Sequence, residues 1–236
     1  MIKDNKLFHY GKCAHYAYND DAKTHYKKLG YTNCKFIEHD GAQAYIVSNT
    51  KHITICFRGT EPKEFNDIKA DLNFLWSKGF HKGFYKEFLK LQKSIELELD
   101  RIQKRKAKPI HIVGHSLGGG IATVAAYHIS GVEEVVTFGS PRATTWWKQR
   151  SCPILLTRVV NNNDVVPRVP FAILGFKHAG KLQYINYYGN WRPLTPWQRF
   201  KDQWRSRVRA FKKGVPFDGL YDHSMVQYNR YLKIED

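Results

Sequence analysis

The sequence of 236 residues predicts an α/β fold, with a mostly parallel central sheet and helices on both faces, formed by one domain over residues 1–236. Short β-branched runs at 110–113, 135–138 and 155–160 have the length and composition of buried strands. Segments with helical periodicity lie before and between these runs, which is typical of α/β architectures with a parallel sheet. A chain of this length can bury one large core.

The first part of the chain supplies a helix and a hairpin. Small and aromatic residues recur every four positions over 12–29, which predicts an amphipathic helix ending at Gly30. The runs 42–48 and 52–57 are separated by three turn residues and read most simply as two paired strands.

Two helices are expected next. Residues 61–78 carry an apolar face, which fits either a core helix or a lid beside the loop at Thr60. Residues 84–105 have a regular buried stripe and basic residues at their end, which complement the helix dipole. This second helix is interpreted as scaffold.

A candidate nucleophile lies in the segment 109–130, which reads as strand, sharp turn and small-residue helix. Its turn, Gly114-His115-Ser116-Leu117-Gly118, fits the G-x-S-x-G pattern of the nucleophile elbow in α/β hydrolases. Glycines flank the serine because the strained turn leaves no room for side chains. A structural glycine-rich turn is the alternative, but the strand before it and the helix after it favour a nucleophile.

A carboxylate and a histidine follow in the order that such a fold requires. Asp164 comes directly after the strand-like run 155–160, at the sheet edge where Ser116 is expected, although an aspartate in a loop can also be a simple turn former. Of the histidines after Asp164, His178 precedes a further strand at 182–188, whereas His223 opens the final helix on a loop. The sequence favours His223 as the base.

Two backbone amides are candidate oxyanion donors. One belongs to Leu117, the residue after the nucleophile, and the other to Thr60, just beyond the strand 52–57. Thr60 could instead cap the helix that follows.

Together these motifs resemble the class 3 lipase family, the fungal-lipase-like branch of the α/β hydrolases. The resemblance runs from about residue 40 to the C-terminus, on Cys56-Phe57-Arg58-Gly59-Thr60, Ala70-Asp71-Leu72, His81-Lys82-Gly83-Phe84, Gly114-His115-Ser116-Leu117-Gly118-Gly119, Thr137-Phe138-Gly139-Ser140-Pro141-Arg142, Asn162-Asn163-Asp164-Val165-Val166-Pro167 and Asp222-His223-Ser224. It implies the α/β-hydrolase fold and hydrolysis of lipid esters.

The resemblance also implies roles for single residues. It implies Ser116 as nucleophile, Asp164 as acid and His223 as base, with oxyanion donors at Thr60 and Leu117. It further implies a lid near 61–70 and a support for the oxyanion loop at Asp71. Compared with fungal triacylglycerol lipases, the lid is poorer in apolar residues and a basic insertion precedes the histidine; both favour phospholipids as substrates.

The formal net charge of +17 predicts an anionic partner or surface. No nucleic-acid-binding motif accompanies the charge, so a nucleic-acid partner is not expected. The four cysteines lack metal-ligand spacing, and neither a metal nor a cofactor is expected. The polar N-terminus does not resemble a signal peptide, so we expect a cytoplasmic protein, or one released by another route, with peripheral membrane contact as an option.

Much of the charge lies in residues 192–213, which hold eight Lys or Arg residues against one Asp. Pro196 suits a helix start, and the apolar side chains of this segment fall within an arc of about 80°. Either this stripe packs on the sheet, which we favour slightly, or it lies in a membrane interface, with the cations facing anionic headgroups. The membrane-binding candidates are Trp197, Phe200, Trp204, Arg205, Arg209 and Phe211.

Two functions therefore remain. The first is a serine carboxylester hydrolase of the lipase or phospholipase A type, which acts through a Ser-His-Asp triad and an acyl-enzyme. The second is a catalytically idle hydrolase fold that binds anionic membranes or nucleic acid through its basic helix.

Overall fold

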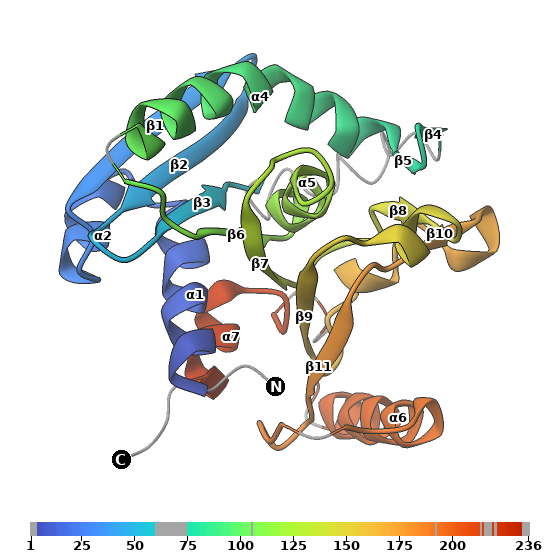
Figure 1. The fold of residues 1–236 in the computed structure, drawn as a ribbon. Coiled ribbons are helices and arrows are strands. Elements are labelled where there is room, and N and C mark those ends of the chain that lie inside the picture. The colour runs from blue at the N-terminus through green and yellow to red at the C-terminus, as the bar shows by residue number, and fades with distance from the viewer. Residues whose placement is uncertain are drawn as a thin grey trace.

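The computed structural model describes residues 4–59, 75–104, 106–191, 193–212, 214, 219 and 221–232. A seven-stranded sheet forms its centre, in the order β1-β2-β3-β6-β7-β9-β11 (Figure 1). These strands are β1 (Asn33–His39), β2 (Ala42–Ser48), β3 (Ile53–Phe57), β6 (Ile110–His115), β7 (Val132–Phe138), β9 (Leu155–Asn161) and β11 (Lys181–Ile185). The strands from β3 to β11 pair in parallel and β1, β2 and β3 pair antiparallel, so the expected mostly parallel sheet is confirmed.

Helices cover both faces of the sheet, as expected. The helices α4 (Lys82–Gln103) and α5 (Leu117–Ala125) pack on one face, against side chains such as Ile112 and Val135. The helices α1 (Asp4–Tyr16) and α7 (Met225–Leu232) pack on the other face, against Val113 and Val136. Successive side chains of a strand point to opposite faces, and both are apolar in β6 and β7 because both faces are covered.

The N-terminal region differs from the sequence prediction in two ways. The predicted helix over 12–29 is wrong as one element, because α1 ends at Tyr16 and α2 (Ala22–Lys28) begins after a turn. Asn19, Asp20 and Asp21 lie in or next to this turn, and such side chains favour turns over helix interiors. The edge strand β1 was not predicted; its mostly exposed side chains give no strand-like apolar run.

A second sheet of four short strands lies beside α4, in the order β10-β8-β5-β4. Its strands are β4 (Trp76–Ser77), β5 (Phe80–His81), β8 (Thr144–Thr145) and β10 (Phe176–Lys177). The described end of the predicted helix 61–78 is therefore a strand, paired with β5. The rest of that predicted helix or lid, including Asp71, lies outside the described residues, as does Thr60.

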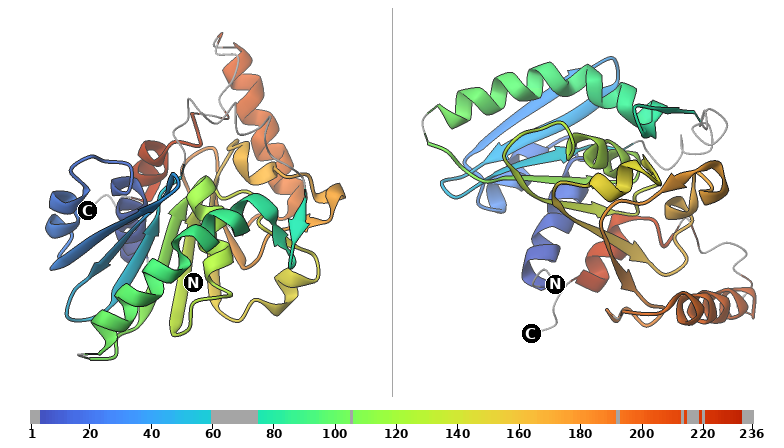
Figure 2. Two further views of the ribbon diagram at one scale, coloured as in Figure 1. Left: turned by 90° about the horizontal axis from the view of Figure 1, so that it is seen from above. Right: turned by 45° about the vertical axis from the view of Figure 1, so that its right-hand side comes forward.

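The helix α6 (Pro196–Lys212) lies at the β11 edge of the main sheet and projects away from the rest of the molecule (Figures 1 and 2). No helix in the described part of the chain is long and apolar enough to cross a membrane.

His81 is a buried histidine at the end of β5. Its ring stacks on Phe84 with centroids 4.3 Å apart, and neither ring nitrogen has a hydrogen-bond partner among the described residues. Burial lowers the pKa of His81 to about 4. The ring is therefore neutral in the folded protein at pH values where the unfolded chain already binds a proton.

The replacement His81→Phe is expected to make stability less sensitive to acid. A histidine whose folded pKa is lowered stabilises the fold above its unfolded pKa of about 6.5, and that stability is lost as pH falls toward 4. The free energy of unfolding of His81→Phe should fall less steeply between these pH values, by up to about 1.4 kcal/mol per pH unit. Urea denaturation at several pH values measures both slopes; equal slopes would contradict the expectation, and the curves should run parallel above pH 7.

Candidate active site

The candidate nucleophile lies on a strained turn between β6 and α5. Ser116 has φ +56° and ψ −129°, a left-handed backbone conformation that a non-glycine residue rarely adopts. The close approach of neighbouring segments explains the flanking glycines. A Cβ at Gly114 would lie 2.2 Å from the carbonyl oxygen of Gly118, and a Cβ at Gly118 would lie 2.3 Å from that of Phe57. The G-x-S-x-G pattern thus has the steric origin that the sequence suggests.

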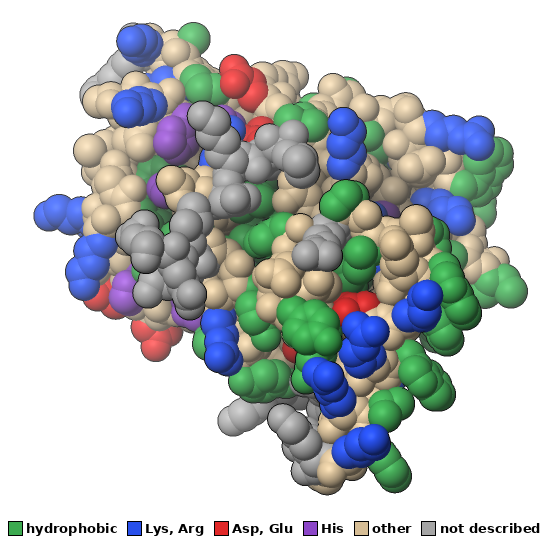
Figure 3. Space-filling view, turned by 90° about the horizontal axis from the view of Figure 1, so that it is seen from below, with side chains coloured by type: hydrophobic (Ala, Val, Ile, Leu, Met, Phe, Trp, Pro, Cys, Tyr) green, Lys and Arg blue, Asp and Glu red, His purple; other side chains and the backbone are tan. Residues whose placement is uncertain are grey.

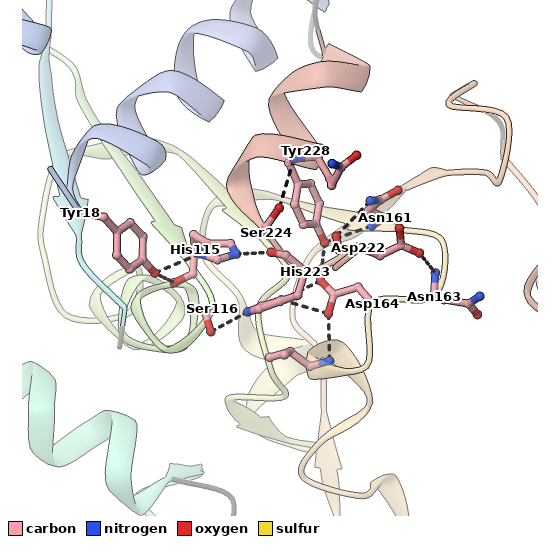
Figure 4. A network of polar contacts seen from close by, with 12 residues as sticks. Tyr18, His115, Ser116, Asn161, Asn163, Asp164, Asp222, His223, Ser224 and Tyr228 are labelled. Carbon is pink, nitrogen blue, oxygen red and sulfur yellow. Dashed lines mark hydrogen bonds and ion pairs between the residues drawn. The ribbon is translucent and has the colours of Figure 1, made fainter. Parts of the chain in front are cut away.

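Ser116, His223 and Asp164 come from three separate elements and meet at the carboxyl ends of the strands (Figure 4). The Nε2 atom of His223 lies 2.8 Å from Ser116 Oγ. Its Nδ1 atom lies 3.0 and 2.9 Å from the two carboxylate oxygens of Asp164. Because a carboxylate only accepts, Nδ1–H is the donor and Nε2 is left to accept the Ser116 hydroxyl proton. All three residues are buried.

A tyrosine that the sequence analysis did not single out completes the environment of Asp164. The Tyr228 hydroxyl donates to Asp164 Oδ2 at 2.6 Å, and the Val166 N–H donates to Oδ1 at 2.9 Å. Burial and the Asp164 charge raise the pKa of Tyr228 well above its usual value, so the phenol stays protonated. The apolar and aromatic residues that are buried in α7 are Met225, Tyr228 and Leu232, and this helical spacing could have marked Tyr228 as inward-facing.

The backbone of His223 is fixed by a second histidine. His115 Nε2–H donates to the His223 carbonyl oxygen at 2.7 Å, and its Nδ1 accepts from the Tyr18 hydroxyl at 3.0 Å. Burial, and then the neighbouring His223, lower the pKa of His115 well below its usual value, so the ring remains neutral. This contact holds the loop that carries His223 against the elbow.

The end of β9 holds the same loop from the other side. The Asn161 side-chain amide donates to the Asp222 carbonyl oxygen at 3.0 Å, and the Asn163 N–H donates to the Asp222 carboxylate at 3.1 Å. The loop that supplies Asp164 is therefore bonded directly to the loop that supplies His223.

His178, the other histidine that follows Asp164, is engaged elsewhere. Its Nε2–H donates to the Pro167 carbonyl oxygen at 2.8 Å. The structure thus brings His223, and not His178, to Ser116.

One of the two expected oxyanion donors is described. Leu117 is the first residue of α5, so its N–H has no intrahelical acceptor and is available beside Ser116. The other donor, Thr60, lies outside the described residues. The chain just before it is close to the elbow, because a Cβ at Gly59 would lie 2.7 Å from the His115 carbonyl oxygen.

A family model described as Lipase (class 3) matches residues 54–174, more than half of the chain. The chain belongs to the class 3 lipase family. The match includes Ser116 and Asp164 and ends before His223, so the position of the histidine rests on the geometry above. The family resemblance seen in the sequence is confirmed.

Relatives of this class 3 lipase include two fungal proteins. A lipase from Rhizomucor miehei is 30% identical over 154 residues, which cover 57% of this chain and 42% of that protein. Secreted mono- and diacylglycerol lipase 1 from Fusarium solani is 27% identical over 189 residues, which cover 66% of this chain and 55% of that protein. The chain thus spans about half the length of these relatives.

A solved structure supports the fold. The native propeptide complex of Rhizomucor miehei lipase aligns with a TM-score of 0.68 at 25% identity, over 79% of this chain and 70% of that chain. The α/β-hydrolase fold predicted from the sequence is confirmed.

The basic helix of this class 3 lipase, α6, lies beyond the residues that the family model matches. Its polar face meets the sheet and its aromatic face points away, which is the opposite of the orientation that we favoured. Its aromatic side chains are exposed, at 63% for Trp197, 53% for Phe200, 60% for Trp204 and 84% for Phe211. The expectation that this stripe packs on the sheet is wrong.

Polar side chains of α6 face the sheet instead. Asp202 is buried and accepts hydrogen bonds from the Tyr184 hydroxyl and the Tyr187 N–H, both at 3.0 Å. Gln203 donates to the Asn162 carbonyl oxygen at 3.1 Å. The sheet edge offers polar groups, which only the polar face of α6 can satisfy.

The two arginines named as membrane candidates differ in their surroundings. Arg205 is exposed, whereas the Arg209 guanidinium lies over the Tyr187 ring, 5.1 Å from its centroid. Among the described residues, no group of three or more His, Cys, Asp or Glu side chains could hold a metal ion.

Proposed function

We propose that this class 3 lipase is a serine carboxylester hydrolase that cleaves acyl esters of lipids. The bonded chain from Ser116 Oγ through the His223 ring to the Asp164 carboxylate carries the proposal, because it is the geometry that activates a serine hydroxyl. The relatives named as lipases support the substrate class.

The reaction proceeds through four proton transfers at His223 Nε2, two in acylation and two in deacylation. Ser116 Oγ attacks the ester carbonyl carbon while its proton passes to Nε2, and the Leu117 N–H donates to the oxyanion that forms. The protonated imidazole then gives its proton to the leaving alcohol, which yields the acyl-enzyme. Water, deprotonated by His223, attacks the acyl group and releases the fatty acid as Ser116 regains its proton. Asp164 orients the ring and stabilises its positive charge throughout.

We further propose that phospholipids, especially anionic ones, are preferred over triacylglycerols, and that α6 docks on the lipid surface. The exposed aromatic stripe supports this proposal, because large apolar side chains that face water mark a membrane or protein contact. Hydrophobic and basic side chains lie side by side on the face of the molecule that includes the projecting α6 (Figure 3). Aromatic and cationic groups together suit a helix in an anionic interface.

The test compares hydrolysis at a surface with hydrolysis in solution. Wild type is expected to release fatty acids faster from vesicles of phosphatidylglycerol and phosphatidylcholine than from triacylglycerol emulsions. The triple variant Trp197→Ser, Trp204→Ser and Phe211→Ser should lose about tenfold or more of the vesicle activity, because it buries less apolar surface in the membrane. It should keep its turnover of a soluble short-chain ester.

The matched control removes exposed apolar side chains from another helix. Leu89 and Leu97 are exposed on α4, and their replacement by serine should leave both activities unchanged. If the triple variant hydrolysed vesicles as fast as wild type, α6 would not be the docking surface. Faster release from triacylglycerol emulsions would refute the phospholipid preference.

A further inference from the structure

Four arginines converge on one cavity of about 280 Å³ between α6, the β9 and β11 strands and the loop after β9. Arg158 lines the cavity from β9, and Arg199 lines it from α6. Arg142 and Arg168 line the cavity from the loops that follow β7 and β9. Tyr184 and Gln203 supply further polar groups to the lining. The four side chains belong to segments that are distant in the sequence.

These arginines lack the partners that buried cations normally have. The Nε atoms of Arg158 and Arg199 and one terminal nitrogen of Arg168, Nη2, are buried without a hydrogen bond to any described residue. In the described part of the chain, none of the four guanidinium groups forms an ion pair with a carboxylate. Among the described residues, Arg142 alone of the four donates side-chain hydrogen bonds, through Nη1 to the carbonyl oxygens of Arg168 and Pro170.

The one carboxylate in the lining, Asp164, carries a single negative charge against four guanidinium groups and, among the described residues, forms no ion pair with any of them. Its oxygens already accept from His223, Tyr228 and Val166. Burial, followed by the positive charges of Arg142 and Arg199, lowers the pKa of Arg158 to about 10, so its guanidinium is still charged at neutral pH. His178 also lines the cavity. Burial, followed by the positive charges of Arg158 and Arg142, lowers the pKa of His178 well below its usual value, so its ring is neutral and adds no charge. Unpaired, converging cations are costly inside a protein and mark a site for an anion.

We propose that this cavity binds a phosphate group through Arg142, Arg158, Arg168 and Arg199. A guanidinium presents its N–H groups as a planar fork that matches the oxygens of a phosphate. A phosphate offers enough acceptor oxygens and charge for several such forks, whereas a carboxylate has two oxygens and one charge. The volume accommodates a phosphate with a small attached alcohol such as glycerol.

The phosphate can come from a lipid headgroup or from a soluble phosphate compound, and the chemistry of recognition is the same. Phe200 lines the cavity and belongs to the exposed aromatic stripe of α6, so the cavity adjoins the surface proposed to dock on lipid. Binding needs no turnover, and the inference therefore stands or falls separately from the proposed hydrolysis.

The first measurement is thermal unfolding with inorganic phosphate, against chloride at equal ionic strength. Phosphate at about 100 times its Kd should raise the melting temperature of wild type by about 5 °C or more. Arg158→Gln and, separately, Arg199→Gln should weaken phosphate binding at least about tenfold by calorimetry, because each removes charge-assisted hydrogen bonds. Arg205→Gln removes the same charge from an exposed position of α6 outside the cavity and should bind phosphate as wild type does.

The melting temperature without phosphate separates a ligand site from a structural role. If the arginines repel one another, Arg158→Gln should melt at or above the wild-type temperature in chloride and should lose the phosphate-dependent rise. Destabilisation of Arg158→Gln in chloride, with the phosphate-dependent rise retained, would overturn the proposal. The proposal would also be overturned if phosphate and chloride had the same effect on the melting temperature of wild type. The same conclusion would follow if Arg205→Gln lost as much phosphate binding as Arg158→Gln.

The second measurement identifies the source of the phosphate. In the Ser116→Ala background, binding is compared between galactolipid vesicles that carry phosphatidic acid and galactolipid vesicles that carry oleic acid. If the ligand is a lipid headgroup, Arg158→Gln weakens binding to phosphatidic acid vesicles more than to oleic acid vesicles, and inorganic phosphate competes. Arg205→Gln, at a position proposed to contact any anionic surface, should weaken binding to both kinds of vesicle alike. If the ligand is soluble, Arg158→Gln binds the two kinds of vesicle with the same relative affinity as wild type while it loses inorganic phosphate. Retention of both kinds of binding by Arg158→Gln would refute the site.

Discussion

Replacing Ser116 with alanine is expected to lower kcat for a soluble short-chain ester by about 10⁵-fold to 10⁶-fold. The loss is this large because the hydroxyl that forms the acyl-enzyme is removed, and water must then attack the ester directly. Adding His223→Ala to Ser116→Ala should cost little more. The two side chains act as one unit, joined by the 2.8 Å hydrogen bond between Oγ and Nε2, and the base has no function without the nucleophile.

The measurement is single-substrate kinetics on the two single variants and the double variant, each checked for folding by circular dichroism. A fluorophosphonate probe should label wild type and leave Ser116→Ala unlabelled. His178→Ala, which removes a ring bonded to the Pro167 carbonyl oxygen, should keep its probe reaction. Losses that multiply in the double variant would mean that Ser116 and His223 act independently. An unlabelled wild type would favour the catalytically idle alternative.

The elbow and the central strands were predictable because local chemistry determines them. The G-x-S-x-G turn needs its glycines for steric reasons that act within a few residues, and the clashes at Gly114 and Gly118 bear this out. The buried strands β6 and β7 are apolar on both faces, which makes them visible as short runs. The exposed edge strand β1 has no such pattern and was missed.

The orientation of α6 was not predictable from its periodicity. Helical spacing shows which side chains share a face, and it does not show which face meets the protein. That choice depended on polar groups of the sheet edge, chiefly the Tyr184 hydroxyl and the Tyr187 N–H, which Asp202 satisfies. The expectation that the apolar stripe packs on the sheet was therefore wrong, and its contact with a membrane stays a prediction.

Residues that act through tertiary contacts were also beyond the sequence. Tyr228 carries no motif that indicates a role beside the triad, and His115 occupies the variable position before Ser116 in the G-x-S-x-G pattern, which does not specify its bond to the His223 carbonyl oxygen. The arginine-lined cavity was beyond the sequence for the same reason. Arg142, Arg158 and Arg199 come together only when the parallel strands and α6 are assembled. The net charge of +17 predicts an anionic partner and does not indicate where on the molecule such a partner would bind.

The second large effect is expected for Asp164→Asn, which should lower kcat by about 10⁴-fold. Asp164 accepts from three donors, which are His223 Nδ1–H, the Tyr228 hydroxyl and the Val166 N–H. An asparagine has one acceptor oxygen, and its NH₂ group would then face a donor. The arrangement can be satisfied if the imidazole changes tautomer, so that Nδ1 accepts and Nε2 carries the proton. That ring cannot take the proton of Ser116.

Tyr228→Phe provides the graded comparison for Asp164→Asn. It removes the hydrogen bond to Oδ2, together with the one that the hydroxyl accepts from the Asn161 N–H, and it keeps the carboxylate, the Nδ1–H donor and the correct tautomer. We expect a loss of about tenfold to 100-fold, which matches one charge-assisted hydrogen bond. The two variants are compared by kcat on the same soluble ester. Because only Asp164→Asn alters the tautomer, its kcat should be at least about 100-fold lower than that of Tyr228→Phe. Comparable kcat values would show that the change of tautomer does not cause the loss.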